Sequence, residues 1–126
     1  MKMLLAIALG GALGALGRHV VGSQLMRLLG TQFPWGTLTV NVAGSLAMGA
    51  LIELMALKVQ VSPEVRAFLT VGLLGGFTTF SAFSLDVAVL YERGALGLAV
   101  SYALASLIAS VGALFVGLRL MRLALA

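Results

Sequence analysis

The residues with the richest chemistry lie together in one apolar stretch, Gly75–Ser84, which reads Gly-Gly-Phe-Thr-Thr-Phe-Ser-Ala-Phe-Ser. Adjacent glycines followed by two β-branched threonines form helix weakly, so the pattern favours a local break. In a membrane, the carbonyl oxygens that a break frees must find a neighbouring helix, water or a bound cation. The stretch therefore indicates either an ion-binding interruption or a helix that packs closely through its glycines.

Three phenylalanines in this stretch, Phe77, Phe80 and Phe83, recur at every third position and are expected to lie along one stripe of a helix. A packing interpretation makes them core residues. An aromatic ring also has a positive edge, so rings turned edge-on toward a path can stabilise a desolvated anion without a formal charge. Ser81 and Ser84 would add hydroxyl donors to such a path.

Isolated polar residues interrupt two other apolar stretches. Asn41 lies six positions beyond Trp35, which suits the membrane interface, and its buried amide must donate either to an anion or to another helix. Tyr102, Ser106 and Ser110 are spaced as a polar stripe on one helical face. Serines in membranes often bond their own backbone, so a structural interpretation of this stripe stays open.

Charged residues within the apolar runs are few. Arg18 either extends its side chain to the headgroups or gives a water-filled mouth a positive potential. Glu53, Asp86 and Glu92 fall near the ends of apolar runs, where solvated or paired roles are expected. A proton-coupled mechanism therefore lacks an acid in the middle of a helix.

Composition excludes several classes of protein. The chain has no cysteine and a single histidine, His19, which rules out disulfides, Cys-based metal sites and metal sites built from several histidines. It shows no catalytic triad, phosphate loop or acid/base pair of carboxylates, so we expect no enzyme. The basic residues are scattered at the ends of apolar runs, which favours headgroup anchoring over nucleic-acid binding.

The elements that must position these residues are membrane helices. The chain of 126 residues is 61% apolar and 10% charged, with a mean hydropathy of +1.14, and a spanning helix needs about 20 predominantly apolar residues. We expect an all-α membrane protein with one transmembrane domain, residues 1–126. Its four predicted helices cover residues 3–28, 35–57, 63–92 and 94–122, the third broken near its middle.

An even number of spans places both termini on one side of the membrane. That side then carries the basic residues Lys2, Lys58, Arg66, Arg119 and Arg122, and the other side carries Arg27 and Arg93. The positive-inside rule gives this chain only a weak preference, so insertion in both orientations is permitted. Four helices alone can hardly enclose a hydrated path, and a transport function would therefore call for a homo-oligomer.

Three sets of residues resemble one known family. They are Gly17-Arg18 in the first predicted helix, Phe33–Leu38 with Val40-Asn41 in the second, and Gly75–Ser81 with Phe83-Ser84 in the third. In motif order, length and span number the chain resembles the fluoride channels of the CrcB or Fluc family over essentially its whole length.

This resemblance implies an antiparallel homodimer with two fluoride pathways, each built from both subunits. The implied pathway residues are Asn41 as an amide donor, Phe80 and Phe83 as ring edges, and the hydroxyls of Ser81, Ser84, Tyr102, Ser106 and Ser110. Arg18 would be a vestibule residue. Backbone carbonyls of Gly75 and Thr78 from both subunits would hold a structural sodium ion on the dimer axis. One departure is Ala82, which stands where the family usually has threonine or serine.

The resulting hypothesis is passive, selective export of cytoplasmic fluoride through the bilayer of the cell (inner) membrane. An alternative is a small dual-topology multidrug exporter, which needs an embedded acid in the first helix, where this chain has none. A third possibility is a helical assembly without transport. That interpretation explains the glycines but gives no purpose to Asn41 or to the aromatic and polar stripes.

Overall fold

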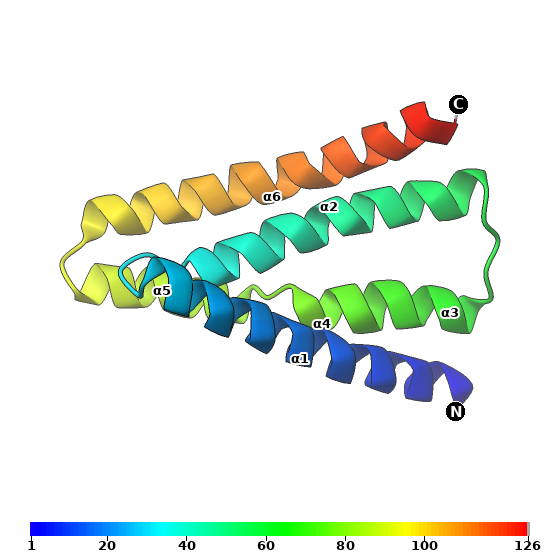
Figure 1. Ribbon diagram of the computed structural model, residues 1–126, viewed down its shortest axis with the longest axis horizontal. Coiled ribbons are helices and arrows are strands. Elements are labelled where there is room, and N and C mark those ends of the chain that lie inside the picture. Colours follow the sequence, from blue (N-terminus) through cyan, green and yellow to red (C-terminus); the bar gives the residue numbers. More distant parts are fainter. Residues whose placement is uncertain (126) are drawn as a thin grey trace.

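The computed structural model describes residues 1–125, and within them the chain is helical, with no strand (Figure 1). Four helical segments are long and apolar enough to cross a membrane, which confirms the predicted all-α membrane fold. The elements are α1 (Lys2–Leu29), α2 (Trp35–Leu57), a composite third segment and α6 (Leu96–Leu125). The third segment consists of α3 (Pro63–Ala67), η1 (Phe68–Leu74), α4 (Gly75–Phe77) and α5 (Ser81–Glu92).

Local signals at the ends of the helices account for these boundaries. Ser62 caps α3, because its side-chain oxygen accepts a hydrogen bond of 3.2 Å from the backbone N–H of Val65, and Pro63 occupies the first turn. Gly30 and Gly94 follow α1 and α5 with φ of 86° and 81°, a conformation that residues with a side chain rarely adopt. The connections therefore turn sharply and keep the spans antiparallel.

Glycines bring the helices into backbone contact. α2 packs most extensively along α6, whereas α1 packs along η1 and α4 (Figure 1). A Cβ on Gly76 would lie 2.7 Å from the carbonyl oxygen of Gly11, and a Cβ on Gly117 would lie 2.7 Å from the backbone nitrogen of Ala50. Each distance is too short for a carbon atom, so these positions accept only glycine without a shift of the helices.

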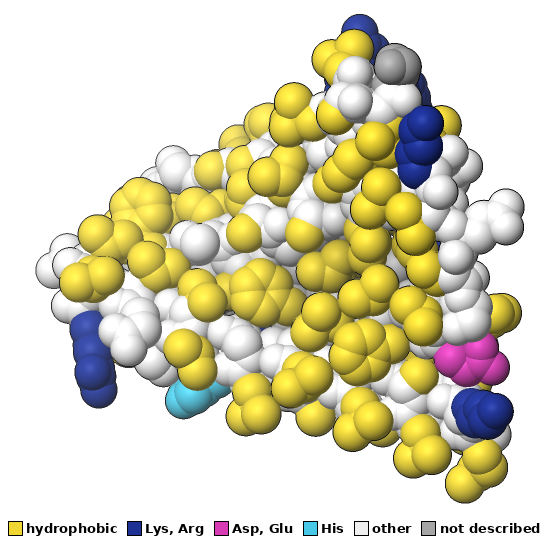
Figure 2. All heavy atoms as spheres, turned by 45° about the vertical axis from the view of Figure 1, so that its right-hand side comes forward, with side chains coloured by type: hydrophobic (Ala, Val, Ile, Leu, Met, Phe, Trp, Pro, Cys, Tyr) yellow, Lys and Arg dark blue, Asp and Glu magenta, His cyan; other side chains and the backbone are white. Residues whose placement is uncertain are grey.

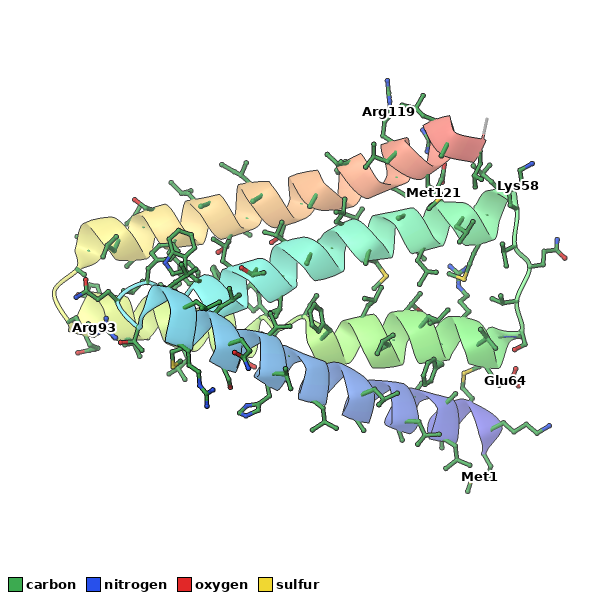
Figure 3. The ribbon with its side chains drawn as sticks, in the orientation of Figure 1. Met1, Lys58, Glu64, Arg93, Arg119 and Met121 are labelled. Carbon is green, nitrogen blue, oxygen red and sulfur yellow. The ribbon has the colours of Figure 1, made fainter. Side chains whose placement is uncertain are left out.

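The outer surface is apolar, as expected of helices that face lipid. Large hydrophobic side chains are widely exposed, among them Leu16, Ile108 and Phe115. Figure 2 shows hydrophobic side chains over much of the face that it draws. Met1 and the end of α6 lie at the same end of the bundle, where Figure 3 also shows Lys58 and Arg119, whereas Arg93 lies at the opposite end. This arrangement agrees with the two sides expected from the sequence.

An ion pair joins α2 and α6 near their C-terminal ends. Nε of Arg122 on α6 lies 2.6 Å from Oε1 of Glu53 on α2, and Glu53 is buried. This pair holds the terminal ends of α2 and α6 together. Of the two roles expected for Glu53, solvated or paired, the structure shows the paired one.

The third segment differs from the other three. η1 is a seven-residue π-helical stretch, a rare geometry that often marks functional positions. α4 ends after Phe77, Thr78 is extended with φ −86° and ψ 159°, and α5 begins at Ser81. We call residues 78–80 the interruption; it lies near the middle of the 63–92 span and organises the site described next.

Candidate functional site

Asn41 contacts the backbone of the interruption twice. Its Nδ2 donates to the carbonyl oxygen of Thr79 at 2.9 Å, and its Oδ1 accepts from the backbone N–H of Thr79 at 2.7 Å. Both polar backbone groups of Thr79 are thereby satisfied by one side chain from α2. Because an amide carries two N–H bonds, one N–H of Asn41 remains free for another acceptor.

Two backbone donors are diverted at the interruption. In a continuous helix the N–H of Thr79 would donate to the carbonyl of Gly75, but it donates to Asn41 instead. The N–H of Ala82 would donate to the carbonyl of Thr78, but it donates to Oγ1 of Thr79 at 3.1 Å. The carbonyl oxygens of Gly75 and Thr78 therefore lack the donors that a continuous helix would supply.

Both of these residues line a cleft of about 340 Å³ between α2, the third segment and α6. The same cleft is lined by five of the residues predicted from the sequence: Asn41, Phe80, Phe83, Ser106 and Ser110. We call it the ring cleft. The structure thus brings together side chains from three spans that the sequence had placed at separate positions.

Two hydroxyls in the ring cleft have no partner. The Oγ atoms of Ser106 and Ser110 are buried, and within residues 1–125 neither has a hydrogen-bond partner. The structural interpretation, in which membrane serines bond their own backbone, does not hold for these two. An unsatisfied buried hydroxyl is costly, so both are ready to donate to a ligand.

The other predicted hydroxyls behave differently. Oγ of Ser84 donates to the carbonyl of Phe80 at 3.0 Å, which is the local backbone bond expected of a helical serine. Oγ of Ser81 lies 3.4 Å from Oγ1 of Thr79. Ser81 and Ser84 are exposed on the single chain and do not line the ring cleft.

The two phenylalanines of the ring cleft differ in exposure. Phe80 is 72% exposed and Phe83 is 9% exposed, and their ring centroids lie 5.4 Å apart at an interplanar angle of 45°. Phe83 continues into the core, where its ring lies 5.2 Å from that of Tyr102. One wall of the ring cleft is therefore anchored in the bundle, and the other faces outward.

Phe77 does not share their stripe, so the expectation that all three phenylalanines lie along one face is wrong. A Cβ added to Gly44 would lie 3.2 Å from the Phe77 ring, and one added to Gly17 would lie 3.5 Å from it, which places this ring between α1 and α2. The cause is the interruption, because a helical spacing of three residues holds only where the helix is continuous.

Tyr102 is fully buried, and its hydroxyl donates to Oδ2 of Asp86 at 3.1 Å. It therefore packs behind Phe83 but does not line the ring cleft with Ser106 and Ser110. From the sequence, Asp86 was expected only to lie near the end of a span. Asp86 and Tyr102 are sixteen positions apart and lie on different helices, so no helical periodicity in the sequence links them.

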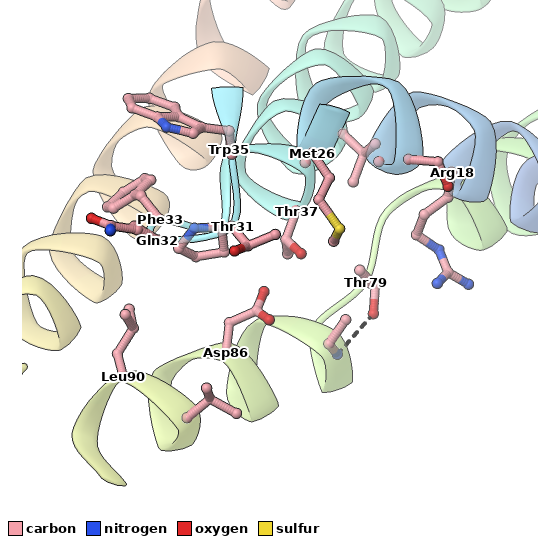
Figure 4. A pocket seen from close by; sticks show the side chains of 18 of the residues that line it. Arg18, Met26, Thr31, Gln32, Phe33, Trp35, Thr37, Thr79, Asp86 and Leu90 are labelled. Atoms are coloured by element: carbon pink, nitrogen blue, oxygen red, sulfur yellow. Dashed lines mark hydrogen bonds between the residues drawn. The ribbon is translucent and has the colours of Figure 1, made fainter. Parts of the chain in front are cut away.

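A second hollow, about 580 Å³, lies on the other side of the interruption (Figure 4). We call it the outer cleft. Arg18 from α1 and Asp86 from α5 line it, as do His19, Arg93 and Ala82, so the methyl group of Ala82 faces this hollow and not the ring cleft.

Arg18 also contacts α4, just before the interruption. Its Nε donates to the carbonyl oxygen of Gly76 at 3.1 Å. Neither of the two roles expected from the sequence, anchoring to the headgroups or giving a mouth a positive potential, predicted this bond. Thr79 lines both clefts, so this one residue lies between the two hollows. Among the described residues, no group of three or more histidine and acidic side chains could hold a metal ion.

Comparison with known proteins gives a consistent result. The CrcB-like protein, Camphor Resistance (CrcB) family matches residues 5–118. The chain is 60% identical to the "Fluoride-specific ion channel FluC" of Rhodospirillum centenum, with the whole of both chains covered. It is 61% identical to the protein of the same name from Chelativorans sp., covering 97% of this chain and 98% of the relative, and 56% identical to that of Agrobacterium fabrum, covering 92% and 93%.

Proposed function

The chain belongs to the CrcB-like family, and from that premise we propose that it is a fluoride-selective ion channel, not an enzyme, through which fluoride leaves the cytoplasm passively. Fluoride that enters a cell as the neutral acid ionises at neutral pH and is trapped. A selective channel lets the anion leave down its electrochemical gradient without energy coupling. The multi-pass fold suits the cell's inner membrane.

The observation that carries this function is the pair of buried, unpartnered hydroxyls, Ser106 and Ser110, in the ring cleft. A fluoride ion that leaves water must recover hydrogen bonds, and these two hydroxyls with the free N–H of Asn41 are donors without competing partners. The rings of Phe80 and Phe83 complete a narrow, largely apolar wall. A small anion that forms strong hydrogen bonds fits this environment better than a larger one.

A second copy of the chain would complete the pathway. Phe80 lines the ring cleft yet is 72% exposed, so in a single chain one wall of the path would face lipid. An antiparallel homodimer with two pathways, each built from both copies, would cover this ring. The weak charge difference between the two ends of the bundle supports insertion in both orientations.

A structural sodium ion fits the interruption. The carbonyls of Gly75 and Thr78 have lost their helical donors, and the same two carbonyls from an antiparallel partner would give four oxygen ligands on the dimer axis. Hard cations take oxygen ligands of this kind. When bound, the ion would satisfy the carbonyls and lower the cost of holding an anion nearby.

The small multidrug exporter remains the contrasting function. Such a protein would carry an acid within its first span, and α1 (Lys2–Leu29) contains no aspartate or glutamate. The geometry of the ring cleft also offers donors to an anion and no carboxylate to a cationic drug. Neither observation favours the exporter.

Fluoride efflux from liposomes that contain the purified protein tests the function directly. A fluoride electrode should record rapid release, and chloride release from the same preparation should stay at the background of empty liposomes. A folded, dimeric preparation that releases no fluoride, or that releases chloride equally fast, would overturn the proposal. Drug-driven proton flux would move the assignment to the exporter.

A further inference from the structure

The interruption has to be maintained against a strong tendency to close. Inside a bilayer, unpaired backbone N–H and C=O groups have no water to bond, so a span gains stability by forming a continuous helical ladder. The Gly75–Ser84 stretch forms helix weakly, but weak propensity alone does not hold polar groups apart in an apolar medium. Other parts of the protein must satisfy the groups that the break exposes.

Asn41 supplies one such contact from α2. Its two hydrogen bonds, 2.9 and 2.7 Å long, are both to the backbone of Thr79. In the shorter bond Asn41 accepts from the Thr79 N–H, which in a continuous helix would donate to the carbonyl of Gly75. A continuous helix at Thr79 would therefore require the Asn41 amide to give up both bonds. In an apolar site that leaves a buried amide unsatisfied.

Arg18 supplies a second contact from α1. Its Nε donates at 3.1 Å to the carbonyl of Gly76, the oxygen that would accept from the N–H of Phe80 in a continuous helix. A hydrogen bond from a charged donor is among the stronger ones, and here it occupies the acceptor that closure needs. The other guanidinium nitrogens stay available to the outer cleft.

We infer that Arg18 and Asn41 are positioning residues that hold the interruption open and select which of its carbonyls stay free. Their side chains occupy the carbonyls of Gly76 and Thr79, whereas those of Gly75 and Thr78 remain unoccupied. The inference deepens the proposed function at the same site, because it explains how two carbonyls become ligands. It does not depend on fluoride permeation.

Two substitutions at Arg18 separate positioning from charge. Arg18→Gln keeps an N–H donor at the same distance along the side chain as Nε but removes the charge, whereas Arg18→Met keeps the length and removes both. The measurement is hydrogen–deuterium exchange of the Thr79 amide in the full chain in lipid nanodiscs, with peptides of α6 as internal reference. We expect exchange roughly tenfold slower in Arg18→Met, because a closed ladder bonds the Thr79 N–H to the carbonyl of Gly75, and near wild type in Arg18→Gln.

Asn41→Leu, which removes both bonds to Thr79 and so lets the ladder close, should slow exchange of the same amide by at least about tenfold. Phe80→Ala is the matched control, because it removes a ring of the ring cleft but leaves the contacts from Arg18 and Asn41 intact, and the Thr79 amide should then exchange as in wild type. If Asn41→Leu does not fold, the Arg18 pair decides alone.

Thr79 exchange that is unchanged or faster in Arg18→Met and Asn41→Leu would overturn the inference. So would equal slowing in Arg18→Gln and Arg18→Met, which would make charge the only property that matters. Since exchange is measured without fluoride, a wild-type protein that shows the expected exchange but no fluoride efflux would overturn the proposed function and leave the positioning roles standing.

Discussion

The α2–α6 pair and the interrupted third segment both cross the bilayer, but their backbone polar groups are satisfied in opposite ways. α2 and α6 are continuous helices held by glycine contacts and by the Glu53–Arg122 ion pair at one end. The third segment gives up continuity at residues 78–80 and is satisfied instead by side chains from α1 and α2. Close packing of α2 and α6 thus builds the helical frame, whereas polar side chains build the site, and each can be disturbed separately.

The largest expected effect is on the frame. Gly117→Leu would force a side chain into the backbone of α2 beside Ala50, so α2 and α6 would have to separate. We expect the free energy of unfolding to fall by about 3 kcal/mol or more, seen as a lower midpoint in thermal unfolding. Gly112→Leu on the same helix is the control, because nothing lies within 4 Å of its Cβ position and its stability should barely change.

On the site, Phe80→Leu should reduce fluoride efflux roughly tenfold while the protein stays folded, because a branched side chain lacks the positive ring edge. Fluoride-electrode recordings on liposomes measure the effect. Phe115→Leu is the matched control, since Phe115 is an exposed phenylalanine of α6 that does not line the ring cleft. Equal efflux from both variants would show that the Phe80 ring does not contribute to the fluoride pathway.

A smaller effect is expected from Ser106→Ala and Ser110→Ala. Because neither hydroxyl has a partner within residues 1–125, its removal should leave the unfolding midpoint unchanged or slightly higher. Efflux should nevertheless fall by about threefold to fivefold in each variant, since a donor to the anion is lost. A loss of stability without a loss of efflux would show that these serines belong to the frame and not to the site.

The smallest effect is expected at the ion pair. Glu53→Gln keeps an acceptor for Arg122 but removes the charge, and because the Arg122 side chain is 58% exposed, we expect a loss of only about 0.5 to 1 kcal/mol with efflux unchanged. Glu92→Gln provides the charge-matched control near the opposite end of the bundle. A strong loss of efflux in Glu53→Gln would show that this ion pair contributes to the site and not only to the helical frame.

The positions of the helices and several of their close contacts could be predicted from the sequence. The four predicted spans match the observed helices within a few residues, and Ser62 and Pro63 start the third span as their types suggest. Glycines at Gly72 and Gly76 also face α1 closely, as small-residue spacing predicts. These features follow from local propensity and from helical periodicity, which a single sequence records directly.

Several residues that line the ring cleft could be named from the sequence, but their contacts could not. The ring cleft unites Asn41, Phe80, Phe83, Ser106 and Ser110, yet the bonds of Asn41 to Thr79 and of Arg18 to Gly76 join residues 38 and 58 positions apart. Such bonds depend on how whole helices are rotated and packed, and no periodic pattern encodes that. The departure of Phe77 from its stripe has the same origin, because it follows from where the helix breaks.

The π-helical stretch η1 also affects how the third segment can accommodate a change in its length. A π-helical turn holds about one residue more than an α-helical turn, so Phe68–Leu74 stores surplus length just before the glycines of α4. A one-residue deletion there would let the backbone relax to α-helix and leave the residues that follow in nearly their present orientation relative to Pro63. Gly76 would still face Gly11, and the acceptor of Arg18 would stay in place. The same deletion in α5 would rotate everything after it by about 100°, so η1 tolerates the loss of a residue that a regular helix does not.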